Sequence, residues 1–193
     1  MRRTPLRMPE TIRRQSWGVL AGCWLLAATT PGNTARAADP PPAQDNAKQV
    51  VGLFLKSCVE FPGDRAALRE WAKKVGLPEL RDNGADVFLH GLPGAVFDAS
   101  IKGTKQVLVS EENGSCSAFA PRADGPTVLG DLERILRDSG VKLNIVADKA
   151  DPEESKLQHR EYTATGAKRE WRMLISTVNN PTGGEVMLTV NPW

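Results

Sequence analysis

The sequence predicts an α+β domain with a mostly antiparallel sheet, and three observations lead to that class. Apolar residues recur at helical spacing up to about residue 75 and again over 127–139. In seven other short runs, apolar and polar residues alternate with a period near two, as they do in half-buried strands. Long crossovers between these runs are few, which favours antiparallel neighbours. The expected order is α-α-β-β-β-α-β-β-β, with three packing helices and six to seven strands.

Residues 1–37 have the three parts of a signal peptide. Five arginines lie within the first 14 residues, 12 largely apolar residues follow at 17–28, and A-R-A at 35–37 fits the cleavage rule. Twelve residues are too few to cross a bilayer, which takes roughly 20. We therefore predict cleavage after Ala37, a periplasmic or secreted protein, and no transmembrane anchor in the mature form.

Two other routes remain open within the leader. The residues L-A-G-C at 20–23 match a lipobox, and lipidation would anchor the protein through Cys23. The apolar run continues past Cys23 as W-L-L, whereas a lipoprotein usually continues into a polar tether. Arg13 and Arg14 also suggest the twin-arginine export route.

The charge balance changes when the leader is removed. The whole chain has 25 basic and 23 acidic residues, and the leader contains six of the basic and one of the acidic residues. The mature chain therefore has 19 basic and 22 acidic residues, a net charge of −3. Without a basic stripe, we expect no nucleic-acid partner.

The Pro-rich stretch at 38–46 is expected to be a disordered tether, and 47–193 a single α+β domain. The first helix is expected at 46–59, because one face of that segment is apolar. The second, at 65–75, begins after the N-cap Asp64 and stops at Gly76. A short helical turn at 85–89 would end at His90, and a third long helix is expected at 127–139.

The seven predicted strands follow the period-two runs. They cover residues 95–100, 106–110, 115–120, 142–147, 157–165, 170–178 and 185–190. The residues E-E-N-G at 111–114 predict a hairpin between the second and third strands. On a regular strand Cys116 and Phe119 would point to opposite faces, so a bulge or turn between them is a further hypothesis.

The cysteine count predicts a disulfide between Cys58 and Cys116. These two remain after leader removal, and an even number in an exported chain indicates pairing. The alternatives are a reactive thiol pair and a metal site. The chain has no C-x-x-C motif, and its two histidines and two remaining cysteines match no zinc spacing. No metal or cofactor is expected.

The densest polar cluster is H-R-E-Y at 159–162, which supplies the main candidate site. On a strand, His159 and Glu161 would point to one face and could do acid–base chemistry. The alternative is a solvated edge strand, since the sequence places no nucleophile beside them, and no catalytic residue is assigned. His90 is expected at a helix end, where it would interact with the helix dipole.

A second candidate patch mixes charge with an aromatic ring at 168–172. Trp171 and Arg172 could contact a ligand, and they complete a candidate binding patch with His159 and Glu161. The alternative is an ordinary strand with Trp171 pointing inward and Arg172 outward.

Four motifs resemble a family of uncharacterised proteobacterial exported proteins and lipoproteins. They are F-L-x-x-C-V at 54–59, E-W-A at 70–72, F-L-x-G-x-P-G at 88–94 and G-x-C-x-x-F at 114–119. The resemblance implies the exported location and a paired set of cysteines, and it implies no activity. The expected function is a non-enzymatic binding or accessory domain with a partner protein in the cell envelope. The alternatives are an inhibitor or immunity protein against an envelope enzyme, and an envelope hydrolase using His159 and Glu161.

Overall fold

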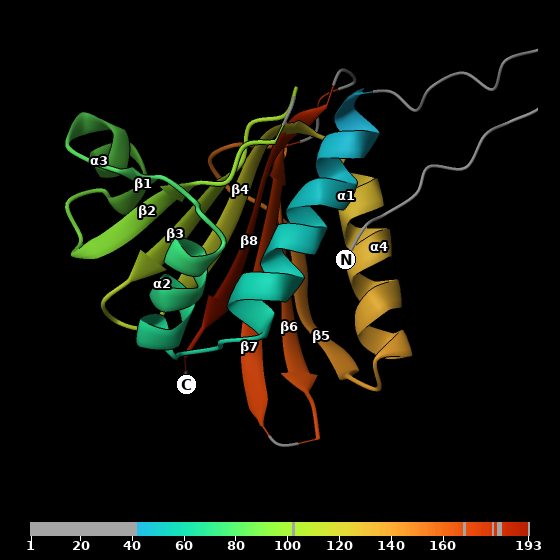
Figure 1. Cartoon of the computed structure of the whole chain (residues 1–193). Helices are drawn as coiled ribbons and strands as arrows, with labels where there is room; N and C mark the ends of the chain where they lie inside the picture. Colours follow the sequence, from blue (N-terminus) through green and yellow to red (C-terminus); the bar gives the residue numbers. More distant parts are fainter. Residues whose placement is uncertain (1–41, 102, 168, 179, 181–182, 193) are drawn as a thin grey trace, which may run out of the picture. The chain divides into compact units, whose positions relative to one another are not determined.

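The computed structural model describes residues 42–192 except 102, 168, 179 and 181–182. The expected signal peptide, the lipidation candidate Cys23 and residues 38–41 of the expected tether lie outside these residues. The described chain forms an α+β unit with one eight-stranded sheet, in the order β1-β2-β3-β4-β8-β7-β6-β5 (Figure 1). Every neighbouring pair of strands is antiparallel, which confirms the predicted class. No helix within the described ranges is long and apolar enough to cross a membrane.

The strands reproduce the seven predicted runs and add one short strand. They are β1 Glu79–Leu80, β2 Gly94–Asp98, β3 Val107–Glu111, β4 Cys116–Ala123, β5 Lys142–Ala150, β6 Leu157–Thr165, β7 Glu170–Val178 and β8 Gly184–Asn191. The added strand, β1, has two residues, which is too short to show a period in the sequence. The latest strand in the chain, β8, pairs with both β4 and β7 and so lies inside the sheet.

The helical segments begin and end close to the predicted positions, with one correction at the start. They are α1 Pro42–Phe54, the π-helical turn η1 Leu55–Val59, α2 Arg65–Lys74, α3 Asn83–Leu89 and α4 Gly125–Asp138. Residues 42–46, expected to be a disordered tether, form the beginning of α1. Proline is compatible with a first helical turn. Asn46 is buried, and its Nδ2 donates to the carbonyls of Pro121 and Arg122, both at 3.3 Å.

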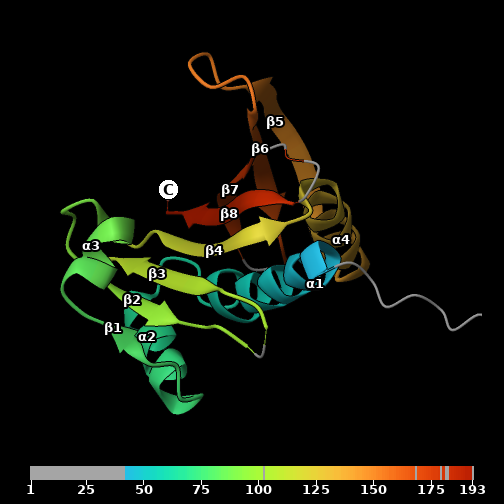
Figure 2. The same cartoon turned by 90° about the horizontal axis from the view of Figure 1, so that it is seen from above.

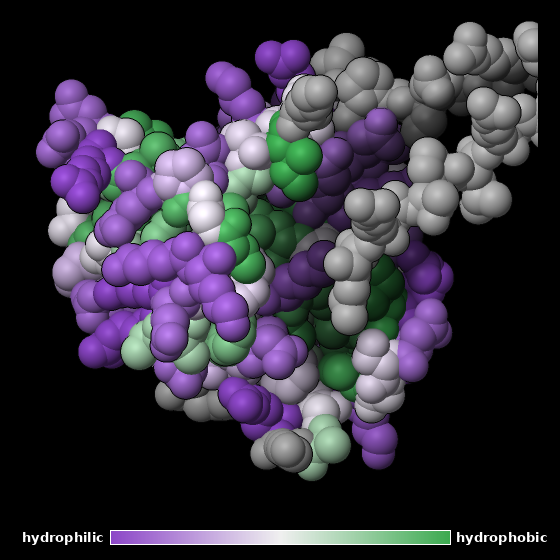
Figure 3. Space-filling view, in the orientation of Figure 1, coloured by the Kyte–Doolittle hydropathy of each residue, from purple (hydrophilic) through white to green (hydrophobic). Residues whose placement is uncertain are grey.

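Helices α1, α2 and α4 lie on one side of the sheet, and α3 lies on the other side near β2 and β3 (Figure 2). The apolar face of α1 packs against β4 and α4 and is fully or almost fully buried, as its periodicity predicts. Its buried residues are Ala47, Val50, Val51 and Phe54. In the orientation of Figure 1, hydrophilic surface covers α2 and apolar patches appear beside α4 (Figure 3).

Cys58 and Cys116 form the predicted disulfide, with a Cα–Cα distance of 5.3 Å. Cys58 lies in η1, where the sequence predicts an unbroken α-helix. In this turn the Ser57 hydroxyl donates to the carbonyl of Leu53 at 2.7 Å, a contact that competes with the regular helical ladder. Both cysteines are buried in the main core, so the bond joins the end of the first helical segment to the start of β4.

The predicted bulge between Cys116 and Phe119 is wrong. The register of β4 with β8 is unbroken from Cys116 to Ala120, and it shifts only between Ala120 and Ala123. Regular alternation therefore sends Cys116 towards the helices and Phe119 to the other side of the sheet. There the Phe119 ring meets Phe88 of α3, with ring centroids 5.6 Å apart.

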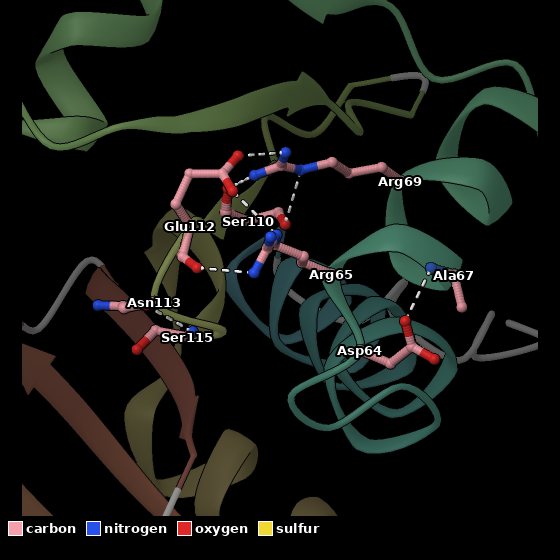
Figure 4. Close-up of polar contacts among 8 residues, drawn as sticks. All are labelled: Asp64, Arg65, Ala67, Arg69, Ser110, Glu112, Asn113 and Ser115. Carbon is pink, nitrogen blue, oxygen red and sulfur yellow. Dashed lines mark hydrogen bonds and ion pairs between the residues drawn. The ribbon is translucent and has the colours of Figure 1, made fainter.

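Two arginines of α2 fasten that helix to the hairpin between β3 and β4 (Figure 4). Arg69 donates to the Ser110 hydroxyl at 3.2 Å, to the Ser110 carbonyl at 2.9 Å and to the Glu112 carboxylate at 2.6 Å. Arg65 pairs with Glu112 at 2.9 Å. The hairpin turns at Gly114, which has φ = 92°, as the predicted Asn-Gly signal requires.

Candidate binding surface

The side of the sheet away from α1 and α4 carries the candidate site, and we call its β4, β6, β7 and β8 part the open face. The side chains that alternation sends to this face include Ser117, Phe119, His159, Leu174, Ser176 and Met187. Of the helices in the described residues, α3 is the one that packs on this side, and it does so over β2 and β3. On the remaining strands Ser117 and Ser176 are buried, whereas Met187 is 40% exposed.

A hollow of about 570 Å³ on the open face lies between α3 and the strands. Phe88 on α3 and Phe119 on β4 form one apolar wall, and Leu174 and Met187 contribute from β7 and β8. His90, which ends α3 in a left-handed conformation with φ = 50°, also lines it. A hollow of this size and lining resembles the concave, largely apolar sites at which proteins bind ligands.

Two smaller hollows share walls with the hollow of about 570 Å³. The first, of about 170 Å³, shares Leu174 and Asn191 with it. The second, of about 290 Å³, shares Phe119, Glu185 and Met187 with it. Because they have lining residues in common, the three hollows are neighbours on the open face, and we call the set of three the groove.

On the floor of the groove, His159 joins two other polar side chains. Its Nδ1 lies 2.9 Å from the Ser176 hydroxyl on the neighbouring strand, and its Nε2 lies 3.2 Å from the carboxylate of Asp151. Backbone N–H groups of Glu154 and Glu153, followed by the contact with His159, lower the pKa of Asp151 below its usual value. These contacts hold the imidazole against the sheet.

The structure separates the predicted His159–Glu161 pair. Both side chains belong to the open face, as predicted, but Glu161 pairs with Arg172 of β7 at 3.4 Å, whereas His159 contacts Ser176 and Asp151. The alternative of an edge strand is wrong, since β6 lies between β5 and β7. Arg172 points outward, and Trp171 is buried among core residues on the helical side, so Trp171 shares no surface with the other three residues.

The charged groups around the groove are mostly carboxylates. Glu111, Glu154 and Glu185 all line it, and Glu111 accepts a hydrogen bond from the Asn113 side chain at 2.9 Å. Arg172 lines the smallest hollow and is paired with Glu161. Among the described residues, no group of three or more His, Cys, Asp or Glu side chains is arranged to hold a metal ion.

Comparison of the chain with protein-family models, with curated proteins and with solved structures gave no match. The function therefore has to be inferred from the geometry of the chain itself.

Most of the apolar residues that line the groove were not predicted from the sequence as part of a site. Phe119 was expected to deviate from its strand because it is out of phase with Cys116, yet that phase is the signal that it belongs to the open face. Met187 carries a similar signal. It alternates with the buried residues Val186 and Leu188, so it is an apolar side chain at a position where a solvated sheet face normally has a polar one.

Proposed function

We propose that this protein is an exported binding protein, and that the open face of its sheet receives a protein partner in the cell envelope. The observation that carries the proposal is the hollow of about 570 Å³ lined by Phe88, Phe119 and Met187 on the side that α1 and α4 leave uncovered. Half-buried and exposed apolar side chains gathered on one face are typical of interaction sites. An inhibitor or immunity protein, whose partner would be an envelope enzyme, is one form of this proposal.

Two features support the exported location. The predicted leader at 1–37 would direct the chain out of the cytoplasm. The disulfide joins buried cysteines, and such bonds persist mainly in oxidising compartments.

The proposal is tested with a photo-reactive residue placed in the groove of the protein in living cells. Position 187 is the site of choice because Met187 is 40% exposed, and Val75, which is 51% exposed at the end of α2, is the matched control. We expect a protein adduct from position 187 that position 75 does not give. The same adducts from both positions, or no adduct from position 187, would contradict the proposal.

The competing function is a hydrolase, and the hydrogen-bonded set of Ser176, His159 and Asp151 is the observation in its favour. Ser176 lies in the interior of β7, opposite His159 on one neighbour and Met187 on the other. Its surrounding backbone is therefore engaged in strand pairing, which leaves few N–H groups to stabilise an oxyanion. Labelling of Ser176 by a fluorophosphonate, lost in Ser176→Ala, would favour the hydrolase over the binding protein.

A further inference from the structure

We infer that the groove takes an extended, basic segment of the partner protein, with apolar side chains directed to its floor and cationic side chains at its two ends. This inference rests on the proposed function and deepens it by naming the chemistry of the occupant. Three properties of the groove carry it: its elongation, its alternating lining and the position of its carboxylates.

The elongation favours a segment over a compact ligand. Each of the two smaller hollows shares lining residues with the hollow of about 570 Å³, so an occupant that reaches all three has to extend across several strands. All three are lined in part by β7 and β8, whose side chains on this face repeat every second residue. An extended peptide has the same period, and its alternate side chains can enter between Phe119, Leu174 and Met187.

The carboxylates flank the largest hollow along the direction of β8. Glu185 lies near one end of that strand. At the other end, the Ser115 hydroxyl lies 3.2 Å from the side chain of Asn191, and the Ser115 carbonyl accepts from the backbone N–H of Glu111. Glu111 is therefore at the Asn191 end. Six residues of strand separate the two ends, which corresponds to roughly 20 Å.

Charge complementarity then selects the occupant. Glu154 adds a third carboxylate in a hollow that Glu185 also lines, and the guanidinium that lines the groove, Arg172, is already paired with Glu161. An acidic segment would meet like charges at both ends of the groove, whereas lysines or arginines about six residues apart would pair with Glu111 and Glu185. Such paired charges mainly increase specificity and the rate of association.

The inference is tested by the binding of short peptides to the mature protein, measured by fluorescence polarisation. The first probe has the sequence Lys-Ser-Phe-Ser-Leu-Ser-Lys. In the second probe glutamates replace the two lysines, and in the third probe serines replace Phe and Leu. We expect the first probe to bind at least tenfold more tightly than either of the others. We expect its advantage over the acidic probe to shrink at high salt, because exposed charges are screened.

Two single-residue variants test whether the first probe binds in the groove. Glu185→Gln is expected to weaken the first probe at least threefold, whereas Glu70→Gln, on an exposed residue of α2 on the helical side, is expected to leave it unchanged. Thermal melts of both variants will show that each is folded.

The other results overturn the inference in distinguishable ways. If the acidic probe binds as tightly as the basic probe or more tightly, the occupant is not a basic segment. The same conclusion follows if no peptide binds while position 187 still gives a protein adduct. In both cases the proposed function is retained. Tighter binding of dodecyltrimethylammonium than of any peptide would replace the segment with a compact amphiphile. If neither the peptides nor the detergent bind and position 187 gives no protein adduct, the proposed function is contradicted as well.

Discussion

Ser110 and Cys116 lie directly opposite each other in the β3–β4 hairpin, and each one holds a different helical segment. Cys116 is bonded to Cys58 of η1, and Ser110 accepts hydrogen bonds from Arg69 of α2 through its hydroxyl and its carbonyl oxygens. One rung of the sheet therefore anchors both η1 and α2.

The first prediction concerns the disulfide. It closes a loop of 58 positions, for which chain entropy gives about 4 kcal/mol as an upper figure. The double variant Cys58→Ser, Cys116→Ser should lose several kcal/mol of unfolding free energy in denaturant titrations. Hydrogen exchange should show that α1 loses protection before β6 and β7 do. Unchanged protection of α1, or two free thiols in the unreduced protein, would contradict the prediction.

The second prediction concerns Arg69. Its side chain is 23% exposed and makes three hydrogen bonds to the hairpin, whereas Arg65 is 52% exposed. Arg69→Met should therefore cost about 2 kcal/mol of unfolding free energy, since it removes charged hydrogen bonds from a half-buried site. Arg65→Met, the matched control, should cost less than about 1 kcal/mol. Equal losses in the two variants would show that the hairpin is not held in this way.

The third prediction concerns pH and the contact between α4 and β6. The Tyr162 hydroxyl donates to Glu133 at 2.6 Å, and Arg160 approaches the same carboxylate at 3.3 Å. Burial disfavours the charged form of Glu133, but the hydrogen bonds from Tyr162 and Arg137 and the neighbouring guanidinium charges outweigh it and lower the pKa of this carboxyl. Burial and the bond to Glu133 raise the pKa of Tyr162, so the phenol stays protonated.

Because the folded pKa of Glu133 is lowered, its stabilisation is complete above the unfolded value of about 4.3 and is lost as the pH falls through the folded value. Thermal melts should therefore show a decline in acid that is shallower in Glu133→Gln, which has no carboxylate to protonate. Glu60→Gln, on an exposed residue after η1, should retain the wild-type slope. A wild-type slope in Glu133→Gln would refute the assignment.

The fourth prediction concerns the different contributions of residues 38–41 and of the beginning of α1 to stability. Starting from a protein that begins at residue 38, removal of 38–41 should leave the melting temperature unchanged. Further removal through Asn46 should lower it, because α1 loses its beginning and the carbonyls of Pro121 and Arg122 lose their partner. Asn46→Ala should reproduce part of that loss. Tolerance of the longer deletion would show that the first turn of α1 contributes little.

The fifth prediction concerns maturation. We expect the mature N-terminus at Ala38, because the A-R-A exit follows a short apolar run. The intact mass of protein recovered from the cell envelope decides this. A mass that corresponds to a triacylated N-terminal Cys23 would instead identify a lipoprotein.

Much of the fold is predictable because single elements carry strong local signals. The alternation in β6 and β7 gives their limits to the residue, and the apolar face of the helix predicted at 46–59 places Cys58 in the core. The start of α1 was missed because the bonds of Asn46 reach residues more than 70 positions away, which no local pattern contains.

The candidate site was less predictable for a related reason. The sequence puts His159 and Glu161 on one face correctly, but their partners come from the neighbouring strand β7 and from the connection between β5 and β6. The groove needs α3 to stand beside β4, and the ring contact between Phe88 and Phe119 depends on that tertiary arrangement. Local periodicity gives the direction of a side chain, whereas a cavity requires the positions of several elements at once.

The central position of β8 has a consequence for how the chain folds. Without it, the sheet consists of two separate pieces, β1–β4 and β5–β7, each with an unpaired strand at the place where β8 belongs. Residues 58 and 116 both precede that junction, so the cross-link can close while the sheet is still in two parts. Insertion of β8 then completes a pairing between distant regions of the chain, a step that slows folding and leaves aggregation-prone edges exposed until it is finished.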